Sequence, residues 1–305
     1  MHSIARTGFD SSGGSGLYDR ARPAYPFEAI SSILKAATSS TGSPLRIVEL
    51  GAGTGICTRM LLSASSSPLH DGSPPPGLTY LRAIEPSTGM RSYFQRSIAD
   101  EETGLAGAMK VKGLLSPNAE VTVEDGGFEN FDAGTDNDAV VIAQAFHWCS
   151  DFEAAIGQAA KALRSGGILA LLWNLEDRET APWVARLRDL YERYEDGAPQ
   201  YRHGKWKVLY ETDSFKSHFK PETPLHISRR LPTNLESVKE RVFSKSYIST
   251  LKEEQRQSLG REIDDLFRKA TDRELGRVWI DQSKGVWEYV SSAKVVGGDP
   301  APFQC

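Results

Sequence analysis

A short apolar segment that runs into three closely spaced glycines is the part of this 305-residue chain with the clearest chemical meaning. Residues 46–50 read Arg-Ile-Val-Glu-Leu, and residues 51–55 read Gly-Ala-Gly-Thr-Gly. Glycines at alternate positions let a backbone bend sharply and approach a ligand, because no Cβ stands in the way. A strand, a glycine turn and a helix at the carboxyl edge of a parallel sheet form a nucleotide-type cofactor site. We therefore predict that this turn holds such a cofactor.

Two acidic residues accompany the glycine turn. Glu85 ends the next predicted strand, Leu78–Ile84, and a carboxylate at that position can accept hydrogen bonds from both hydroxyls of a ribose. Glu49 lies two positions before the first glycine, beneath the turn. Its carboxylate either ties down the loop or meets an ammonium group of the cofactor, and the sequence leaves both roles open.

The spacing of the glycines counts against two common cofactor sites. A dinucleotide fingerprint needs a glycine three positions after its second, where this chain has Ile56. A P-loop needs Gly-Lys-Ser or Gly-Lys-Thr after the turn, and that sequence does not follow here. An NAD-dependent oxidoreductase therefore stays an alternative, to be decided by titrating the protein with both cofactors.

Further motifs along the chain indicate which kind of cofactor site the glycine turn belongs to. Together they resemble the motifs of class I S-adenosylmethionine-dependent methyltransferases. Motif I corresponds to residues 48–55, and the motif after the second strand corresponds to residues 84–87 with Met90. The adenine-edge motif corresponds to residues 126–129. The motifs around strands four and five correspond to residues 143–148 and 163–169. The resemblance covers about Tyr18 to Asn174 and implies a Rossmann-like fold with S-adenosylmethionine as cofactor.

Two sequences indicate a particular branch of this family. Residues 18–26 read Tyr-x-x-x-Arg-Pro-x-Tyr-Pro and residues 144–148 read Gln-Ala-Phe-His-Trp. Both are similar to the trans-aconitate and cantharidin methyltransferase branch, whose members act on small molecules. The resemblance implies that Tyr18 and Arg22 close over the cofactor and meet its carboxylate. Phe128 stands where a small residue is usual in the family, and the proline-rich loop before the second strand is long.

The resemblance implies a cofactor site made by the N-terminal arm, the glycine turn and the strand ends. Its residues are Tyr18, Arg22, Glu49, Gly51, Ala52, Gly53, Gly55, Glu85, Pro86, Met90, Gly127, Phe128, Ala143 and Gln144. Methyl transfer from a sulfonium is an in-line displacement, so the protein mainly aligns the reacting atoms. Such chemistry needs no metal cluster, catalytic triad or carboxylate pair, and the sequence predicts none.

His147 is the candidate catalytic residue. It follows the fourth strand, where cofactor and substrate meet in this resemblance, and a neutral imidazole there could accept a hydroxyl proton. Alternatively, the His-Trp pair only shapes the pocket. Trp148, Trp173 and Trp206 are candidate lining residues of an apolar substrate pocket, with core packing as the other explanation for each.

The pattern of apolar segments predicts a doubly wound α/β fold with a mostly parallel, seven-stranded sheet and a helical C-terminal lid. Five strands alternate with helices and are predicted at residues 45–50, 78–84, 119–123, 139–145 and 168–173. A sixth strand is predicted at residues 225–231, and residues 277–291 are predicted to form a closing strand or a hairpin. Residues 1–17 are expected to be a flexible lead-in, residues 18–180 the cofactor-binding core, and residues 181–305 the lid helices and closing strands.

Composition limits the partners. A formal net charge of -4 gives no basic surface for nucleic acid or an anionic membrane, and no apolar run is long enough to span a bilayer. The N-terminal residues contain no apolar segment typical of a secretory signal. Three cysteines without ligand spacing favour a reducing compartment and argue against a zinc site. We expect a cytoplasmic protein with a small-molecule partner, of unknown oligomeric state.

The sequence therefore predicts S-adenosylmethionine-dependent methyl transfer to an oxygen or nitrogen of a small molecule. The oxygen would belong to a carboxylate or a hydroxyl. A nucleic-acid methyltransferase is disfavoured, because residues 144–147 read Gln-Ala-Phe-His instead of Asn/Asp-Pro-Pro-aromatic. A protein of the same fold that binds the cofactor but catalyses a non-methylating reaction, such as cyclisation, is the alternative.

Overall fold

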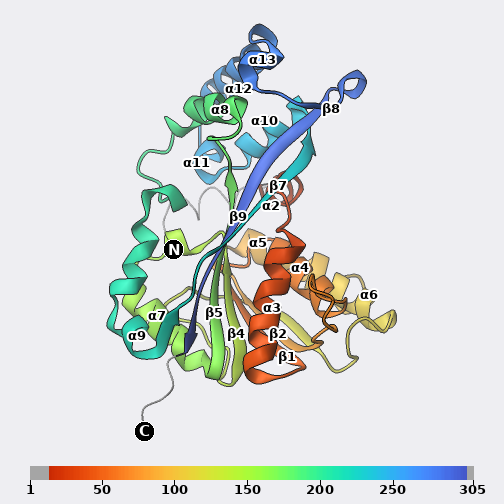
Figure 1. Cartoon of the computed structure of the whole chain (residues 1–305), viewed down its shortest axis with the longest axis vertical. Coiled ribbons are helices and arrows are strands. Elements are labelled where there is room, and N and C mark those ends of the chain that lie inside the picture. Colours follow the sequence, from red (N-terminus) through yellow and green to blue (C-terminus); the bar gives the residue numbers. More distant parts are fainter. Residues whose placement is uncertain (1–13, 301–305) are drawn as a thin grey trace.

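The computed structural model describes residues 14–300 and is built on one nine-stranded sheet (Figure 1). The strand order is β3-β2-β1-β4-β5-β9-β6, and β7 and β8 also pair with β9. The strands are β1 (Leu45–Leu50), β2 (Leu78–Ile84), β3 (Glu120–Glu124), β4 (Asn137–Ala143), β5 (Leu163–Glu176), β6 (Phe219–Pro221), β7 (Leu225–Thr233), β8 (Trp279–Asp281) and β9 (Val286–Pro300).

The first five strands form the parallel part of the sheet, as predicted. Every residue of β4 is buried, as expected for an apolar strand covered on both faces. Ala139 and Val141 of β4 pack in one hydrophobic cluster, whereas Val140 and Ile142 pack in another. This alternation places the first pair under α3 (Phe27–Thr41) and α4 (Ile56–Ser65), and the second pair against α7 (Phe152–Ala162).

The prediction of seven strands is wrong in number. Two of the nine strands, β6 and β8, have three residues each, too few for an alternating pattern to mark them. Residues 277–291, predicted as a closing strand or a hairpin, contain β8 and the first part of the much longer β9, and these two strands pair as a hairpin. β9 runs antiparallel between β5 and β6, so the sheet is mixed at this side.

A second body of helices lies beyond the carboxyl ends of the parallel strands (Figure 1). It has its own hydrophobic core around Trp183 and Trp287. β5, β7 and β9 extend from the sheet toward this body and join the two parts. Its helices are α8 (Pro182–Glu192), α10 (Leu235–Phe243), α11 (Ser246–Ser249), α12 (Glu253–Lys269) and α13 (Asp272–Leu275). The remaining helices are α2 (Gly14–Ala21), α5 (Thr88–Phe94), α6 (Leu105–Val111) and α9 (Asp213–His218).

Helix α2 connects the two bodies near the N-terminus. Asp19 pairs with Arg59 of α4 and accepts a hydrogen bond of 2.9 Å from the hydroxyl of Tyr93 in α5. On its other side, Arg20 pairs with Glu240 of α10 at 2.9 Å. Residues 14–17, which we assigned to the lead-in, are therefore the first turn of a helix, and residues 1–13 lie outside the described part of the chain.

No helix between residues 14 and 300 combines the length and the apolar character that crossing a membrane would require.

Gly55 has a structural role that can be tested directly. It precedes α4 with a φ of +85°, and a Cβ at this position would lie 2.1 Å from Cδ1 of Ile98. We expect Gly55→Ala to lower the free energy of unfolding by about 2–4 kcal/mol, because strain at positive φ and overpacking act together. Urea denaturation followed by circular dichroism measures this change.

Gly113→Ala is the matched control. Gly113 also has a positive φ, +69°, but nothing lies within 4 Å of an added Cβ. Only the backbone strain applies there, so the loss should be about 1 kcal/mol. Equal losses in the two variants would contradict the packing role of Gly55.

Candidate active site

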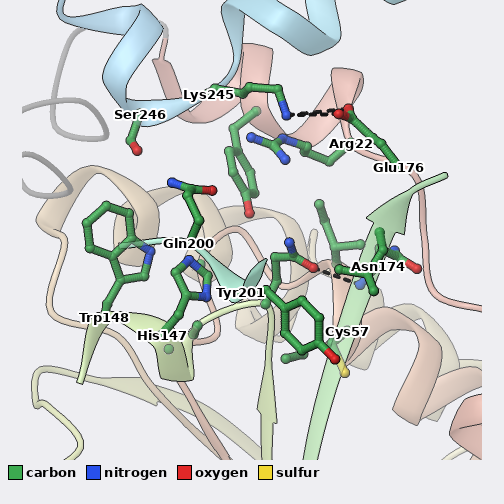
Figure 2. A pocket seen from close by; sticks show the side chains of 18 of the residues that line it. Arg22, Cys57, His147, Trp148, Asn174, Glu176, Gln200, Tyr201, Lys245 and Ser246 are labelled. Carbon is green, nitrogen blue, oxygen red and sulfur yellow. Dashed lines mark hydrogen bonds and ion pairs between the residues drawn. The ribbon is translucent and has the colours of Figure 1, made fainter. Parts of the chain in front are cut away.

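A cavity of about 530 Å³ lies between the sheet and the helical body (Figure 2). The ends of β1, β2, β4 and β5 line one side of it, and residues of α2, α8, α10 and α11 line the other. Most residues predicted for the cofactor or substrate meet here: Tyr18, Arg22, Glu49, Gly51, Ala52, Gly53, Glu85, Pro86, Met90, Gly127, Phe128, Ala143, Gln144, His147 and Trp148. The motifs therefore converge on a single cavity, as the carboxyl ends of parallel strands predict.

The glycine turn is held rigidly at the floor of this cavity. Gly51 donates its N–H to the carbonyl of Ile84 at 2.8 Å, and Gly53 donates to Oε2 of Glu85 at 2.8 Å. Both glycines have positive φ, 69° and 60°, and a Cβ on Gly51 would lie 2.6 Å from that of Ala145. Conformation and space therefore both require glycine at residue 51.

Glu85 is buried and fixes two neighbouring segments. Besides the bond to the glycine turn, its Oε1 accepts a hydrogen bond of 2.8 Å from the N–H of Ser87, the residue that caps α5. The side chain is 5% exposed and lines the cavity. It thus places a buried carboxylate beside the turn, where the sequence predicts the ribose.

Glu49 is a second buried carboxyl group in the cavity wall. The Thr58 hydroxyl donates a hydrogen bond of 2.6 Å to its Oε2, and the residue is 1% exposed. Burial raises the pKa of Glu49 to about 8. The carboxyl group is therefore mostly protonated at neutral pH, and a cation placed beside it would favour its ionised form.

Gln144 has an unusual backbone conformation for its residue type. Its φ is +56°, a left-handed conformation in which a side chain other than glycine is uncommon. The strain is held by two hydrogen bonds: the Gln144 N–H donates to the Leu172 carbonyl at 2.7 Å, and Oε1 accepts from the Asn174 N–H at 2.8 Å. Such strained residues concentrate at functional sites.

The opposite wall carries a buried ionic cluster that the sequence analysis missed. Glu176, at the end of β5, pairs with Arg241 at 2.8 Å and with Lys245 at 3.3 Å, and accepts a hydrogen bond from Tyr191. Although burial opposes its ionisation, Lys245 and Arg241 hold the pKa of Glu176 well below its usual range. Burial lowers the pKa of Lys245 to about 8. The position of Glu176 at the end of a strand is the sequence feature that could have indicated a site residue.

Arg22 differs from the other cations around the cavity. Its Nε donates to the Ser244 hydroxyl at 2.9 Å, and within residues 14–300 it forms no ion pair. By contrast, each of the remaining lysine and arginine residues of the lining is paired with an acidic side chain: Arg178, Arg188, Arg202, Arg241 and Lys245. Arg22 is therefore the cation best placed to receive an anionic group.

His147 lies in η2 (Phe146–Trp148), directly after the turn that follows β4. Its Nδ1 accepts a hydrogen bond of 3.3 Å from Nε1 of Trp173. Burial, with smaller contributions from Arg22 and His203, lowers the pKa of His147 to about 3. The imidazole is therefore neutral at neutral pH. Trp148 lies beside it, with 5.4 Å between the ring centroids.

Three predicted site residues lie outside the cavity lining and need correction. Gly55 packs against Ile98 and Phe94. Trp173 is fully buried on the α7 side of β5, so Asn174, the next residue along the strand, faces the cavity instead. Trp206 packs behind it, with 4.8 Å between the two indole centroids. Tyr201, Gln200, Ser246 and Tyr247 line the cavity where these tryptophans were expected.

Known proteins are similar to this chain in sequence and in fold. Residues 48–171 match the family model described as a methyltransferase domain. Solved structures agree at the level of the fold. One from Anaeromyxobacter dehalogenans, provisionally described as a type II methyltransferase, has a TM-score of 0.56 at 16% identity and covers 92% of this chain and 99% of that one.

Two curated relatives extend the comparison. An uncharacterized methyltransferase of Mycobacterium tuberculosis is 34% identical over 184 residues, which are 60% of this chain and 58% of that protein. An uncharacterized methyltransferase-like protein of Schizosaccharomyces pombe is 27% identical over 250 residues, 82% of each chain. The present chain thus spans 58% of the length of the mycobacterial relative.

The burial of Glu49 predicts a pH-dependent stability. Because its pKa rises from 4.5 to about 8 on folding, the folded protein keeps a proton that the unfolded chain releases within that range. The free energy of unfolding should therefore fall as the pH rises from 4.5 to 8. In Glu49→Gln, which cannot ionise, this decrease should be smaller, with higher stability than the wild type at pH 8.

Urea denaturation at several pH values between 4.5 and 8.5 measures this difference. The same substitution at the exposed Glu120 of β3 is the control, and its pH profile should run parallel to that of the wild type. A Glu49→Gln profile that also runs parallel to the wild type would show that Glu49 does not carry the raised pKa.

Proposed function

We propose that this chain is an S-adenosylmethionine-dependent methyltransferase that acts on a small molecule. The observation that carries the proposal is the meeting of three groups at one cavity: the glycine turn, the buried carboxylate of Glu85 and the guanidinium of Arg22, which has no ion-pair partner among residues 14–300. These groups match the three polar parts of the cofactor, and they come from separate segments of the chain. When bound, the cofactor supplies a methyl group on a positively charged sulfur.

The lining fits the cofactor part by part. Gly51 and Gly53 leave the turn free of side chains at the cavity floor, so a ligand can approach its backbone. We assign the ribose hydroxyls to Glu85 and the carboxylate to Arg22. Glu49 is the acid beneath the turn, and an ammonium group nearby would favour its ionised form. Met90, Gly127 and Phe128 remain for the adenine.

The acceptor is assigned to the far half of the cavity. Residues of α8, α10 and α11 line this half, and the cavity volume of about 530 Å³ is typical of a small-molecule pocket. We propose that these helices form the lid over the acceptor, whereas β6, β7, β8 and β9 of the same C-terminal segment belong to the sheet. The formal net charge of -4 disfavours a nucleic acid as substrate and supports a small molecule.

The assignment of the family branch and of the acceptor atom rests on two motifs. Residues 18–26 and 144–148 resemble the trans-aconitate and cantharidin branch, and Arg22 and His147 within them line the same cavity. This supports methyl transfer to an oxygen or nitrogen of a small molecule. The absence of ligand spacing among the cysteines supports a cytoplasmic location.

Calorimetric titration with S-adenosylmethionine tests the cofactor site. Arg22→Ala and Glu85→Ala should each weaken binding by about 10- to 100-fold, the usual effect of losing a hydrogen bond to a charged group. Arg20→Ala is the matched control two residues before Arg22, because Arg20 pairs with Glu240 and does not line the cavity. Its affinity should equal that of the wild type.

Incubation with the cofactor and an extract of small metabolites tests the transfer itself, with S-adenosylhomocysteine as the measured product. A wild-type protein that does not bind S-adenosylmethionine, or that binds NADH in its place, would refute the proposal. Tight binding of the cofactor without any S-adenosylhomocysteine in any extract would instead identify a non-methylating protein of this fold.

A further inference from the structure

The hydrogen bond between Trp173 and His147 determines where the imidazole carries its hydrogen. The indole Nε1 is a donor only, and it lies 3.3 Å from Nδ1 of the histidine. Nδ1 must therefore be the unprotonated nitrogen, and in a neutral imidazole the hydrogen is then on Nε2.

The environment of Trp173 excludes the other orientation of the ring. Trp173 is fully buried, and Nδ1 is the partner of its N–H among the residues that the structure describes. An imidazole turned by 180° would place a carbon opposite this N–H. The buried donor would then lose its acceptor and keep the full desolvation penalty.

The other ring nitrogen of His147, Nε2, faces the cavity. His147 lines the cavity, whereas Trp173 does not, so Nδ1 faces the core and Nε2 is left for the cavity. Figure 2 shows the imidazole between the side chains of Trp148 and Gln200, both of which also line this space. Within residues 14–300, the bond from Trp173 is the one hydrogen bond of this ring.

We propose that His147 presents an N–H donor, not a base, to the methyl acceptor, and that Trp173 is the positioning residue that fixes this tautomer. The proposal rests on the proposed methyltransferase function and names the property of its acceptor: an oxygen that receives a hydrogen bond from Nε2 and gives no proton to His147.

The charged groups around the imidazole ring also oppose its protonation. The charged and titratable groups that act on His147 are Arg22, directly after α2, and His203 of η3 (Tyr201–His203), and both oppose a positive charge on it. Across the cavity, Arg241 and Lys245 hold the carboxylate of Glu176 and keep its pKa well below its usual range. Glu176 is therefore poorly suited to accept a proton in place of the histidine.

This arrangement favours an acceptor that reaches the cavity already ionised. An anionic oxygen uses its lone pair to form the bond to the methyl carbon, while the pair of the breaking carbon–sulfur bond returns to sulfur. No proton is left over, so no base is needed. A fixed N–H at 2.7–3.1 Å from such an oxygen positions it for in-line attack.

Nitrogen-15 NMR of histidine-labelled protein tests the tautomer without any ligand. The chain has six histidines, and the resonances missing from His147→Gln identify those of residue 147. We expect a hydrogen on Nε2, none on Nδ1, and no titration between pH 5 and 9. A hydrogen on Nδ1, or a titration near pH 6.5, would overturn the proposal.

Trp173→Phe should remove this hydrogen bond and yield a mixture of the two tautomers of His147. Trp206→Phe is the matched control: its indole belongs to the same aromatic stack, but its N–H donates to the Tyr201 carbonyl and not to the histidine. The control should keep the Nε2–H tautomer. Loss of that tautomer in both variants would show that general packing, not the hydrogen bond, determines it.

Turnover distinguishes a donor from a base. With the metabolite extract described above, His147→Leu should form S-adenosylhomocysteine about 100-fold more slowly, the usual effect of removing one such donor. His147→Gln has an amide N–H near the position of Nε2 and should recover a large part of the rate. Equal losses in the two variants would overturn the donor role. Cofactor affinity, measured in parallel, shows separately whether the proposed function itself fails.

Discussion

The hydrogen bond from the Gly53 N–H to the Glu85 carboxylate is the constraint on which the cavity depends. It joins the turn after β1 to the end of β2, two neighbouring parallel strands whose carboxyl ends meet at one edge. The other oxygen of Glu85 fixes the start of α5 through Ser87. One buried carboxylate therefore holds the glycine turn and the next helix in a fixed relation, and charge-assisted bonds of this kind are among the stronger ones.

The parts of the molecule that the sequence predicted well are those encoded locally. β1 and β2 are apolar runs that end directly before Gly51 and Glu85, so their type and their ends can be read from a few residues. Because parallel strands share one carboxyl edge, the residues after each strand must converge, which is why Gly51, Glu85 and Gln144 line the same cavity.

The parts that it missed depend on register and on long-range pairing. Trp173 and Asn174 are adjacent, yet one lies in the core and the other in the cavity, since a shift of one residue along a strand changes the face. Glu176 is paired with Arg241 and Lys245, about 65 residues away along the chain, through a helical body that only folding brings to β5. No local pattern contains that information.

The distribution of charge divides the cavity into two chemically different halves. On the lid side, Glu176 neutralises Arg241 and Lys245, and such a buried cluster is costly to separate. Arg22, at the junction, is held by the hydroxyl and carbonyl of Ser244 and by no carboxylate in the described chain. It therefore keeps its charge available to the cavity while its contact with Ser244 ties α2 to the end of α10. The residue that is best suited to receive an anionic ligand is thus also one of the links between the sheet and the helical body.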